Sequence, residues 1–262
     1  MFPPDFPPIK NKILYAYRVF GKWLSFFIFG LGSVILGTLV LPPMRLVLHP
    51  KTRFQKYGRR FVSATFKFFI TVMGIIGVVK LMPDDREKYK NIFSKIIVAN
   101  HPSLLDVVML ISLIPNADCI VNPYLKKNIL TVVASQLYIF GSSDLDEIFS
   151  SCTETLKHGN CLIIFPEGTR TPRIKKPILK KGAARVALNT GCGIVPIHIG
   201  GTDKFGLGKK DPWYGFNAAE KYIYKLTMKD EITPERFKDL PPPAAAKLIT
   251  NEIEAFLFPK NI

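Results

Sequence analysis

Hydrophobic residues are distributed differently in the two parts of the chain. The first part contains two long apolar stretches, residues 23–41 and 61–82. From Ser94 onward, short apolar runs alternate with longer amphipathic ones, which is the pattern of buried strands connected by helices. The pattern predicts strands at residues 95–99, 118–121, 137–140, 161–165, 194–199 and 222–228, and helices at residues 103–113, 126–134, 145–158, 182–189, 234–238 and 244–258. This alternation indicates an α/β fold with a mostly parallel sheet flanked by helices.

The first apolar stretch predicts a membrane-inserted helix. Residues 23–41 carry no charge, and as a helix they extend about 28 Å, close to the ~30 Å hydrocarbon core of a bilayer. We expect the helix to end at Pro42 and Pro43, and basic residues flank it on both sides. A cleaved signal peptide fits less well, because the run is long and no cleavage site of small residues follows it. A buried core helix is the remaining alternative.

The second apolar stretch, residues 61–82, has two interpretations. Two lysines interrupt it, and two glycines weaken it as a helix. The stretch could cross the membrane, or lie in the interface with its lysine side chains reaching the headgroups. With the first stretch, it predicts a membrane-associated helical segment at residues 1–82, ahead of an α/β domain at residues 83–262. The excess of basic residues after Pro43 favours the cytoplasmic side for that domain.

Composition and charge indicate which kind of molecule the protein binds. The formal net charge is +16, and residues 1–60 hold ten Lys and Arg residues against Asp5, a net charge of +9. A basic segment beside an apolar run favours anionic lipid over nucleic acid, and the sequence carries no nucleic-acid-binding signature. The four cysteines form no CxxC pair and lie among apolar or small residues. We therefore expect buried free thiols in a reducing compartment, and no bound metal.

Two polar strings that follow predicted strands carry the candidate chemistry. The first reads Asn100-His101-Pro102-Ser103-Leu104-Leu105-Asp106, and the second reads Phe165-Pro166-Glu167-Gly168-Thr169-Arg170. Parallel strands place their carboxyl ends at one edge of a sheet, where ligands bind. We therefore expect the two strings to meet in one crevice.

His101 and Asp106 form the candidate catalytic pair. His101 lies just before a predicted helix, so its ring is free to turn back toward Asp106. A carboxylate in that place fixes the tautomer of the imidazole and leaves the other nitrogen to take a proton from an alcohol. A single histidine before a proline is more often a capping or core residue, but Asp106 and the second string favour catalysis. Among the other histidines, His198 could face the site, although core packing is the favoured interpretation.

The second string begins a strongly basic segment. Residues 170–185 contain seven Lys and Arg residues and no acidic residue. Such a run is usually a solvated face. Here it begins at a glycine turn, and the planar guanidinium of Arg170 can grip a phosphate with two N–H groups. Glu167 repels phosphate, so we expect its partner to be an acceptor hydroxyl or Arg170 itself.

The two strings together resemble the signatures of the PlsC-like glycerolipid and lysophospholipid acyltransferases. That family carries an Asn-His-x4-Asp block followed by a Phe-Pro-Glu-Gly-Thr-Arg block, and both are intact here; the resemblance covers about residues 90–205. It implies that His101 is the general base and that Asp106 orients it. It also implies that the acceptor is bound by Glu167, Gly168, Thr169 and Arg170. The lysines of the basic segment could then hold the phosphates of coenzyme A or the acidic face of an acyl carrier protein.

The sequence departs from the family between the two blocks. Many members carry an arginine there that is linked to glycerol phosphate, whereas residues 137–147 contain no arginine and three acids, Asp144, Asp146 and Glu147. If these acids line the crevice they repel a second phosphate charge, which predicts an acceptor other than lysophosphatidic acid. The alternative is that they begin a helix, where its dipole favours them, and face water.

The sequence therefore predicts an O-acyltransferase at a membrane surface. It would move an acyl chain from acyl-CoA or acyl carrier protein to a hydroxyl of a lysophospholipid or another lipid. No cofactor is implied, because the acyl thioester is itself a substrate, and no nucleic acid or metal is expected as a partner. A membrane-bound thioester hydrolase and a non-catalytic membrane-anchored lipid-binding protein are the alternatives; the intact pair His101 and Asp106 argues against the second.

Overall fold

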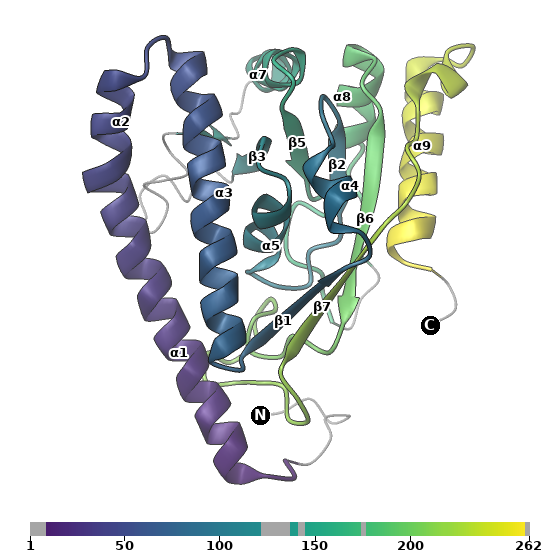
Figure 1. Ribbon diagram of the computed structural model, residues 1–262. Helices are drawn as coiled ribbons and strands as arrows, with labels where there is room; N and C mark the ends of the chain where they lie inside the picture. Colours follow the sequence, from purple (N-terminus) through teal and green to yellow (C-terminus); the bar gives the residue numbers. More distant parts are fainter. Residues whose placement is uncertain (1–8, 122–136, 141–144, 174–176, 260–262) are drawn as a thin grey trace.

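The computed structural model describes residues 9–121, 137–140, 145–173 and 177–259 (Figure 1). Its first part is helical, with α1 (Lys12–Ile35), the π-helical turn η1 (Leu36–Val40), α2 (Leu41–Val47) and α3 (Lys51–Ile75). The rest alternates strands and helices: β1 (Val79–Pro83), α4 (Arg86–Lys90), β2 (Ile96–Ala99), α5 (Asp106–Leu113), β3 (Ala117–Val121), β4 (Ile139–Phe140), α7 (Leu145–Lys157), β5 (Cys161–Ile164), α8 (Gly182–Thr190), β6 (Ile194–Gly201), β7 (Tyr222–Met228), the 3-10 turn η4 (Pro234–Phe237) and α9 (Pro242–Leu257). The helix predicted at residues 126–134 lies outside the described residues.

The described strands form a seven-stranded sheet in the order β1-β7-β6-β2-β5-β3-β4. Five of the six strand pairings are parallel, and the pairing of β6 with β7 is antiparallel. The predicted mostly parallel sheet is therefore confirmed. Because β2 pairs directly with β5, the two polar strings leave the sheet from neighbouring strands at the same edge.

Helices cover both faces of this sheet. In β2, Ile97 and Ala99 face one core together with residues of α3 and α5, whereas Ile96 and Val98 face a second core with residues of α7, α8 and α9. Figure 1 shows α3 along one side of the sheet and α8 and α9 along the other. All four residues of β2 are buried, as expected for a continuous apolar run in a strand covered on both faces.

The first apolar stretch continues through the two prolines. The segments α1, η1 and α2 form a helix of 36 residues, Lys12–Val47. Within η1 the hydrogen-bond register shifts, and the N–H of Leu41 donates to the carbonyl of Leu36. Pro42 and Pro43 then occupy the first turn of α2, where backbone N–H groups have no partner within that helix. The prediction that the helix ends at the prolines is therefore wrong.

The first helix is attached to the α/β domain along one face. Among the described residues, Lys12–Val47 is the single helix long and apolar enough to cross a membrane. The side chain of Lys22 is fully buried, and its Nζ donates to the carbonyls of Trp213 at 2.7 Å and Gly215 at 2.5 Å. On the exposed face, apolar side chains such as Phe20 and Phe27 remain uncovered. The helix therefore joins the domain through one face and offers an apolar face outward.

The second apolar stretch is only partly helical. Phe69 and Met73 of α3 are buried in the core that α3 shares with α5 and the sheet. The helix ends at Ile75, and Gly77 follows with φ of +80°, a conformation that glycine adopts without strain. Residues 79–83 then form β1, which pairs with β7. The helical prediction is therefore wrong for residues 79–82, and the predicted domain boundary at residue 82, which β1 crosses, stays a prediction.

Candidate active site

The two polar strings leave the sheet side by side. Asn100 directly follows β2, and its side-chain amide exchanges two hydrogen bonds with Ile199 of β6. Its Nδ2 donates to the carbonyl of Ile199 at 2.9 Å, and the N–H of Ile199 donates to its Oδ1 at 2.7 Å. This pair of bonds fixes the backbone at the point where His101 begins.

The structure brings the two residues of the predicted catalytic pair together. The Nδ1 atom of His101 lies 2.8 Å from Oδ2 of Asp106. The helix predicted to begin at Ser103 begins instead at Asp106, the first residue of α5. Residues 103–105 form a turn ahead of this helix. At that helix end the dipole also favours a negative side chain.

The carboxylate of Asp106 is held by several donors. Asp106 is fully buried. Its Oδ2 accepts a hydrogen bond from the N–H of Ser103 at 2.7 Å, and its Oδ1 accepts one from the hydroxyl of Ser103 at 2.6 Å. Because both of its oxygens accept hydrogen bonds, Asp106 acts as an ionised carboxylate, and Oδ2 can also accept a hydrogen bond from Nδ1–H of His101. That tautomer leaves Nε2 of the imidazole as an acceptor, which is the state a base requires.

The ring of His101 is fixed on its other side by Phe165. The two rings stack with centroids 4.2 Å apart and an interplanar angle of 23°. The side chain of His101 keeps 18% of its surface exposed, and its Nε2 has no hydrogen-bond partner among the described residues. The nitrogen that would act as the base is therefore free of protein hydrogen bonds in the described part of the chain.

Glu167 lies against the backbone of His101. Its Oε1 accepts hydrogen bonds from the N–H of His101 at 2.9 Å and from the hydroxyl of Thr171 at 2.7 Å. The N–H of Thr171 donates in turn to the carbonyl of His101 at 2.7 Å. Burial raises the pKa of the Glu167 carboxyl, and the bonds from Thr171 and His101 partly offset this. Of the two partners expected for Glu167, Arg170 is not observed, and the acceptor hydroxyl stays a prediction. The second carboxylate oxygen, Oε2, has no partner among the described residues.

Arg170 is oriented by the loop after β6. Its Nη1 donates to the carbonyl of Leu207 at 3.0 Å and to that of Gly208 at 2.9 Å. Its Nε and Nη2 have no partner among the described residues and remain available to a ligand. Gly168 has φ of +65° and closes the turn before Arg170 by donating to the carbonyl of Phe165 at 3.0 Å; Gly168 and Thr169 are both exposed.

Part of the basic segment is neutralised by ion pairs, which its sequence alone does not indicate. Arg173 forms two-pronged ion pairs with Asp203, at 2.6 and 3.1 Å, and with Asp211, at 2.8 and 2.9 Å. Both acids come from the loop after β6, so their approach cannot be seen in residues 170–185. Lys180 lies over the turn at Gly168, with its Nζ 2.9 Å from the position a Gly168 Cβ would take. Lys175 and Lys176 lie outside the described residues.

The acids of the segment 137–147 begin a helix, as the alternative interpretation proposed. Asp146 and Glu147 are exposed in the first turn of α7. The preceding strand, β4, is three strands away from β2, or about 14 Å at the usual strand spacing. Asp144 lies outside the described residues. The described acids therefore give no reason to expect repulsion of a phosphate near His101.

Three of the four cysteines and His198 have structural surroundings, whereas Cys192 is only partly buried, so the expectation of buried thiols is wrong for it. Cys119, Cys152 and Cys161 are buried free thiols, and burial raises the pKa of Cys161 to about 11. The Nδ1 of His198 lies 3.0 Å from the carbonyl of Leu257, and burial lowers the pKa of its imidazole. Within the part of the chain that the structure describes, no group of three or more His, Cys, Asp and Glu residues could hold a metal ion.

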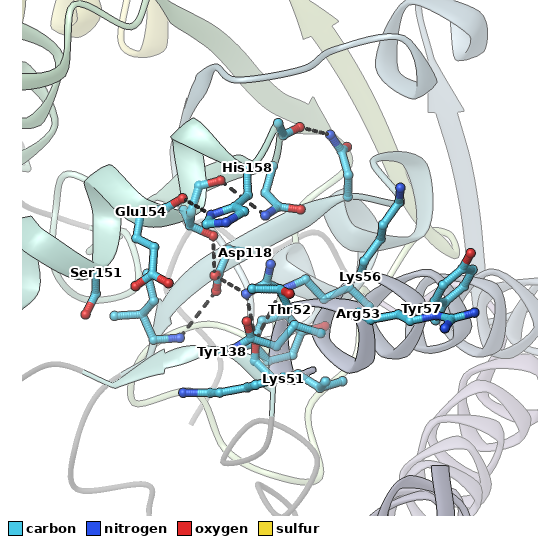
Figure 2. Close-up of a pocket in the computed structure, with 18 of the residues that line it drawn as sticks. Lys51, Thr52, Arg53, Lys56, Tyr57, Asp118, Tyr138, Ser151, Glu154 and His158 are labelled. Carbon is cyan, nitrogen blue, oxygen red and sulfur yellow. Dashed lines mark hydrogen bonds and ion pairs between the residues drawn. The ribbon is translucent and has the colours of Figure 1, made fainter. Parts of the chain in front are cut away.

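A cavity of about 970 Å³ lies apart from the catalytic pair, and its lining includes none of residues 100–106 or 165–171. Figure 2 shows Lys56 of α3 on one side of this cavity and Glu154 of α7 on the other, with Asp118 between them. Asp118 forms a buried ion pair with Arg59 and accepts a hydrogen bond from the hydroxyl of Thr155 at 2.8 Å. These contacts join α3 to β3 and α7, and indicate a structural role.

Three residues that contribute to the site are not identified by sequence reasoning. Ser103 lies inside the first polar string and Thr171 directly follows the second. This closeness to the strings was the sequence signal that could have identified them as site residues. Tyr224 lies 121 positions after Ser103 on β7, and its hydroxyl is 2.8 Å from Oγ of Ser103. Only the antiparallel pairing of β7 with β6 brings it to the site, and a strand residue of this kind carries no local signal.

Comparisons with known proteins agree with this site. A family model described as "Acyltransferase" matches residues 84–200, which include both polar strings. The chloroplastic 1-acyl-sn-glycerol-3-phosphate acyltransferase BAT2 of Brassica napus is 27% identical over 67% of this chain and 52% of its own length. The 1-acyl-sn-glycerol-3-phosphate acyltransferase of Cocos nucifera is 32% identical over 65% of this chain and 56% of its own length. The chain thus spans about half the length of these curated relatives.

A solved structure shares the fold over nearly the whole chain. The 1-acyl-sn-glycerophosphate acyltransferase PlsC from Thermotoga maritima superposes with a TM-score of 0.67 and 21% sequence identity. The match covers 94% of this chain and 97% of that one. At this identity the similarity establishes the architecture, including a helical segment ahead of the sheet.

Proposed function

Residues 84–200 match the acyltransferase family, and from that premise we propose that the chain is a PlsC-like glycerolipid acyltransferase, which transfers an acyl group from a thioester to the free hydroxyl of 1-acylglycerol 3-phosphate. One observation carries the proposal: a buried carboxylate, Asp106, lies 2.8 Å from Nδ1 of His101, while the opposite nitrogen has no hydrogen-bond partner among the described residues. An alcohol is a weak nucleophile until a base takes its proton, and this arrangement supplies such a base.

The chemical step needs one proton-transfer group. Nε2 of His101 takes the proton of the acceptor hydroxyl as its oxygen forms a bond to the thioester carbonyl carbon. The tetrahedral intermediate then breaks its carbon–sulfur bond, and the thiolate leaves with the proton from the imidazolium. Asp106 stabilises the imidazolium between the two transfers. The products are the diacyl lipid and a free thiol, and the proposed chemistry requires no cofactor beyond the acyl thioester.

The acceptor proposal rests on the relatives and on Arg170. All four curated relatives bear names that specify 1-acyl-sn-glycerol-3-phosphate, which opposes our expectation of a different acceptor. The guanidinium of Arg170 is oriented by two carbonyls and keeps N–H groups for a phosphate. Lys180, over the turn at Gly168, could add a second positive charge for the acceptor or for the donor's phosphates. Glu167 keeps the backbone of His101 in place beneath them.

The membrane location follows from the first helix. Lys12–Val47 is attached to the α/β domain through Lys22 and exposes apolar side chains on its other face. We assign this face to the bilayer, so that the domain is held at the surface where lipid acceptors reside. The basic residues after Pro43 favour the cytoplasmic leaflet.

The test is a reconstitution with a matched pair of acceptors. The purified protein in liposomes receives a radiolabelled acyl-CoA with 1-acylglycerol 3-phosphate, with monoacylglycerol, or with no acceptor, and acyl carrier protein replaces coenzyme A in a parallel series. Lipid products are identified by mass spectrometry, and the released thiol is measured in the same samples. We expect phosphatidic acid to form, with thiol release that depends on the phosphate-bearing acceptor.

The other outcomes point to other functions. Thiol release at the same rate without an acceptor would identify a thioester hydrolase and overturn the proposal. Acceptor binding without thiol release, from either donor, would identify a lipid-binding protein. A faster reaction with monoacylglycerol than with 1-acylglycerol 3-phosphate would overturn the assignment of the acceptor alone.

A further inference from the structure

A third residue is connected to the catalytic pair through Ser103. The hydroxyl of Ser103 has a single proton, which it donates to Oδ1 of Asp106 at 2.6 Å. Its oxygen accepts from the N–H of Leu105 at 3.2 Å. The hydroxyl of Tyr224 lies 2.8 Å from the same oxygen, and since the Ser103 proton is already committed, Tyr224 must be the donor. A directed chain of hydrogen bonds therefore runs from Tyr224 through Ser103 to Asp106 and His101.

We propose that Tyr224 is a positioning residue for the His101–Asp106 pair. Its hydroxyl holds the Ser103 proton on Asp106 and thereby fixes the carboxylate that orients the imidazole. This inference rests on the proposed function, but the network itself is a property of the fold. Tyr224 lies outside the segment that matches the family model, residues 84–200.

The surroundings of Tyr224 keep this chain intact. Ser103, Asp106 and Tyr224 are each fully buried, so water does not compete for their hydrogen bonds. Hydrogen bonds in such surroundings polarise one another, so donation by Tyr224 makes Ser103 a stronger donor to Asp106. The ammonium group of Lys204 lies 4.6 Å from the centre of the Tyr224 ring and donates to the carbonyl of Ile223 at 2.9 Å. A cation over the ring strengthens the phenol as a donor.

The same strand provides a matched control. Tyr222 is also fully buried on the same face of β7, and its hydroxyl donates to the carbonyl of Phe205 at 2.6 Å. Tyr222→Phe thus removes a buried tyrosine hydrogen bond of the same kind, but one that does not lead to Asp106. If Tyr224 serves stability alone, the two variants should behave alike.

The first experiment follows the imidazole directly. The full chain in detergent micelles carries isotope-labelled histidine, and NMR records the titration of His101, assigned with His101→Gln. Without the Tyr224 hydroxyl, Ser103 draws less charge from Asp106, so more of the carboxylate charge faces His101 and the imidazolium is better stabilised. We expect the titration midpoint of His101 to rise in Tyr224→Phe and to stay at the wild-type value in Tyr222→Phe. Equal midpoints in wild type and Tyr224→Phe would overturn the proposal.

The second experiment measures turnover. We expect kcat to fall about fivefold in Tyr224→Phe, the effect of losing one neutral hydrogen bond, with KM for both substrates unchanged. The less firmly held carboxylate orients the imidazole less often for proton transfer, and this loss outweighs the better stabilisation of the imidazolium. Because the effect passes through Ser103, adding Tyr224→Phe to Ser103→Ala should cause no further loss. A double variant slowed by the product of the two single effects, or an equal loss in Tyr222→Phe, would contradict the proposed path.

Two provisions separate the possible failures. If wild type transfers no acyl chain but the His101 midpoint still rises in Tyr224→Phe, the network is supported and the proposed function fails. If Tyr224→Phe loses its folded circular dichroism spectrum, fluorotyrosine at position 224 takes its place. It keeps the bond and is a stronger donor, so the midpoint of His101 should then fall; an unchanged midpoint would overturn the inference.

Discussion

Exchange of Asp106 for asparagine changes the chemistry of the catalytic pair with little change of shape. The side chain keeps its volume, but it loses its charge, and one acceptor oxygen becomes an NH2 donor. In the structure, Oδ2 faces His101 Nδ1 at 2.8 Å and the N–H of Ser103 at 2.7 Å, and Oδ1 faces the hydroxyl of Ser103 at 2.6 Å. Neither place suits an NH2 group without a rearrangement.

The two orientations of the amide have different consequences. An NH2 group in the place of Oδ2 would oppose the N–H of Ser103 and force Nδ1 of His101 to accept, which moves the imidazole proton to Nε2 and removes the base. An NH2 group in the place of Oδ1 needs only a rotation of the Ser103 hydroxyl toward Tyr224. We therefore expect the second orientation, in which the tautomer is kept and the loss is that of a charge-assisted hydrogen bond. Such a bond contributes about 1.5–3 kcal/mol, or roughly a 10- to 150-fold decrease in kcat.

The assay is the initial rate of phosphatidic acid formation from acyl-CoA and 1-acylglycerol 3-phosphate, with KM measured for both. Asp85→Asn is the control, because Asp85 also begins a helix, α4, but takes no part in the site. We expect kcat to fall in Asp106→Asn with KM nearly unchanged, and neither to change in Asp85→Asn. An Asp106→Asn protein that is folded and turns over at the wild-type rate would refute the reasoning.

Four further predictions concern binding, stability and location. Arg170→Ala should weaken apparent acceptor binding at least about tenfold, and Arg170→Lys should recover only part of it, because the planar fork is lost; unchanged KM values in both variants would exclude the phosphate role. Arg59→Met should lower the free energy of unfolding by about 3–5 kcal/mol in denaturant titrations, since it leaves the buried Asp118 without its counter-charge; an unchanged midpoint would contradict this. Burial lowers the pKa of His198 below its unfolded value of about 6.5, so stability should be full above that pH and decrease on acidification, with a shallower decrease in His198→Gln; parallel curves would rule out this contribution. Membranes should retain the protein in 1 M salt, where the Debye length is about 3 Å, because the apolar face of Lys12–Val47 holds it; release as soluble protein would contradict the anchor.

The sequence predicts those features whose cause lies in neighbouring residues. β7 is predicted with its observed bounds, because its alternation of buried and more exposed positions is complete within seven residues. His101 and Asp106 can be recognised as a pair because only four residues separate them, and the geometry then depends on one turn. The strands around them are recognisable because each is a short apolar run.

The remaining features depend on contacts between distant segments. β1 appears in the sequence as the end of an apolar helix, and its strand conformation depends on pairing with β7. Arg173 appears free until the loop after β6 brings Asp203 and Asp211 against it. The position of Glu167 beneath His101 likewise depends on the parallel pairing of β2 with β5, which no local pattern specifies.

The most direct test of base catalysis by His101 is the turnover of His101→Ala in liposomes. The variant is compared with wild type for phosphatidic acid formation and thiol release in the same samples, after circular dichroism and flotation show that it is folded and bound to the membrane. A general base contributes roughly 10²- to 10⁴-fold, so both products should fall by at least about 100-fold together. A folded, membrane-bound His101→Ala protein that transfers acyl chains at close to the wild-type rate would contradict the account.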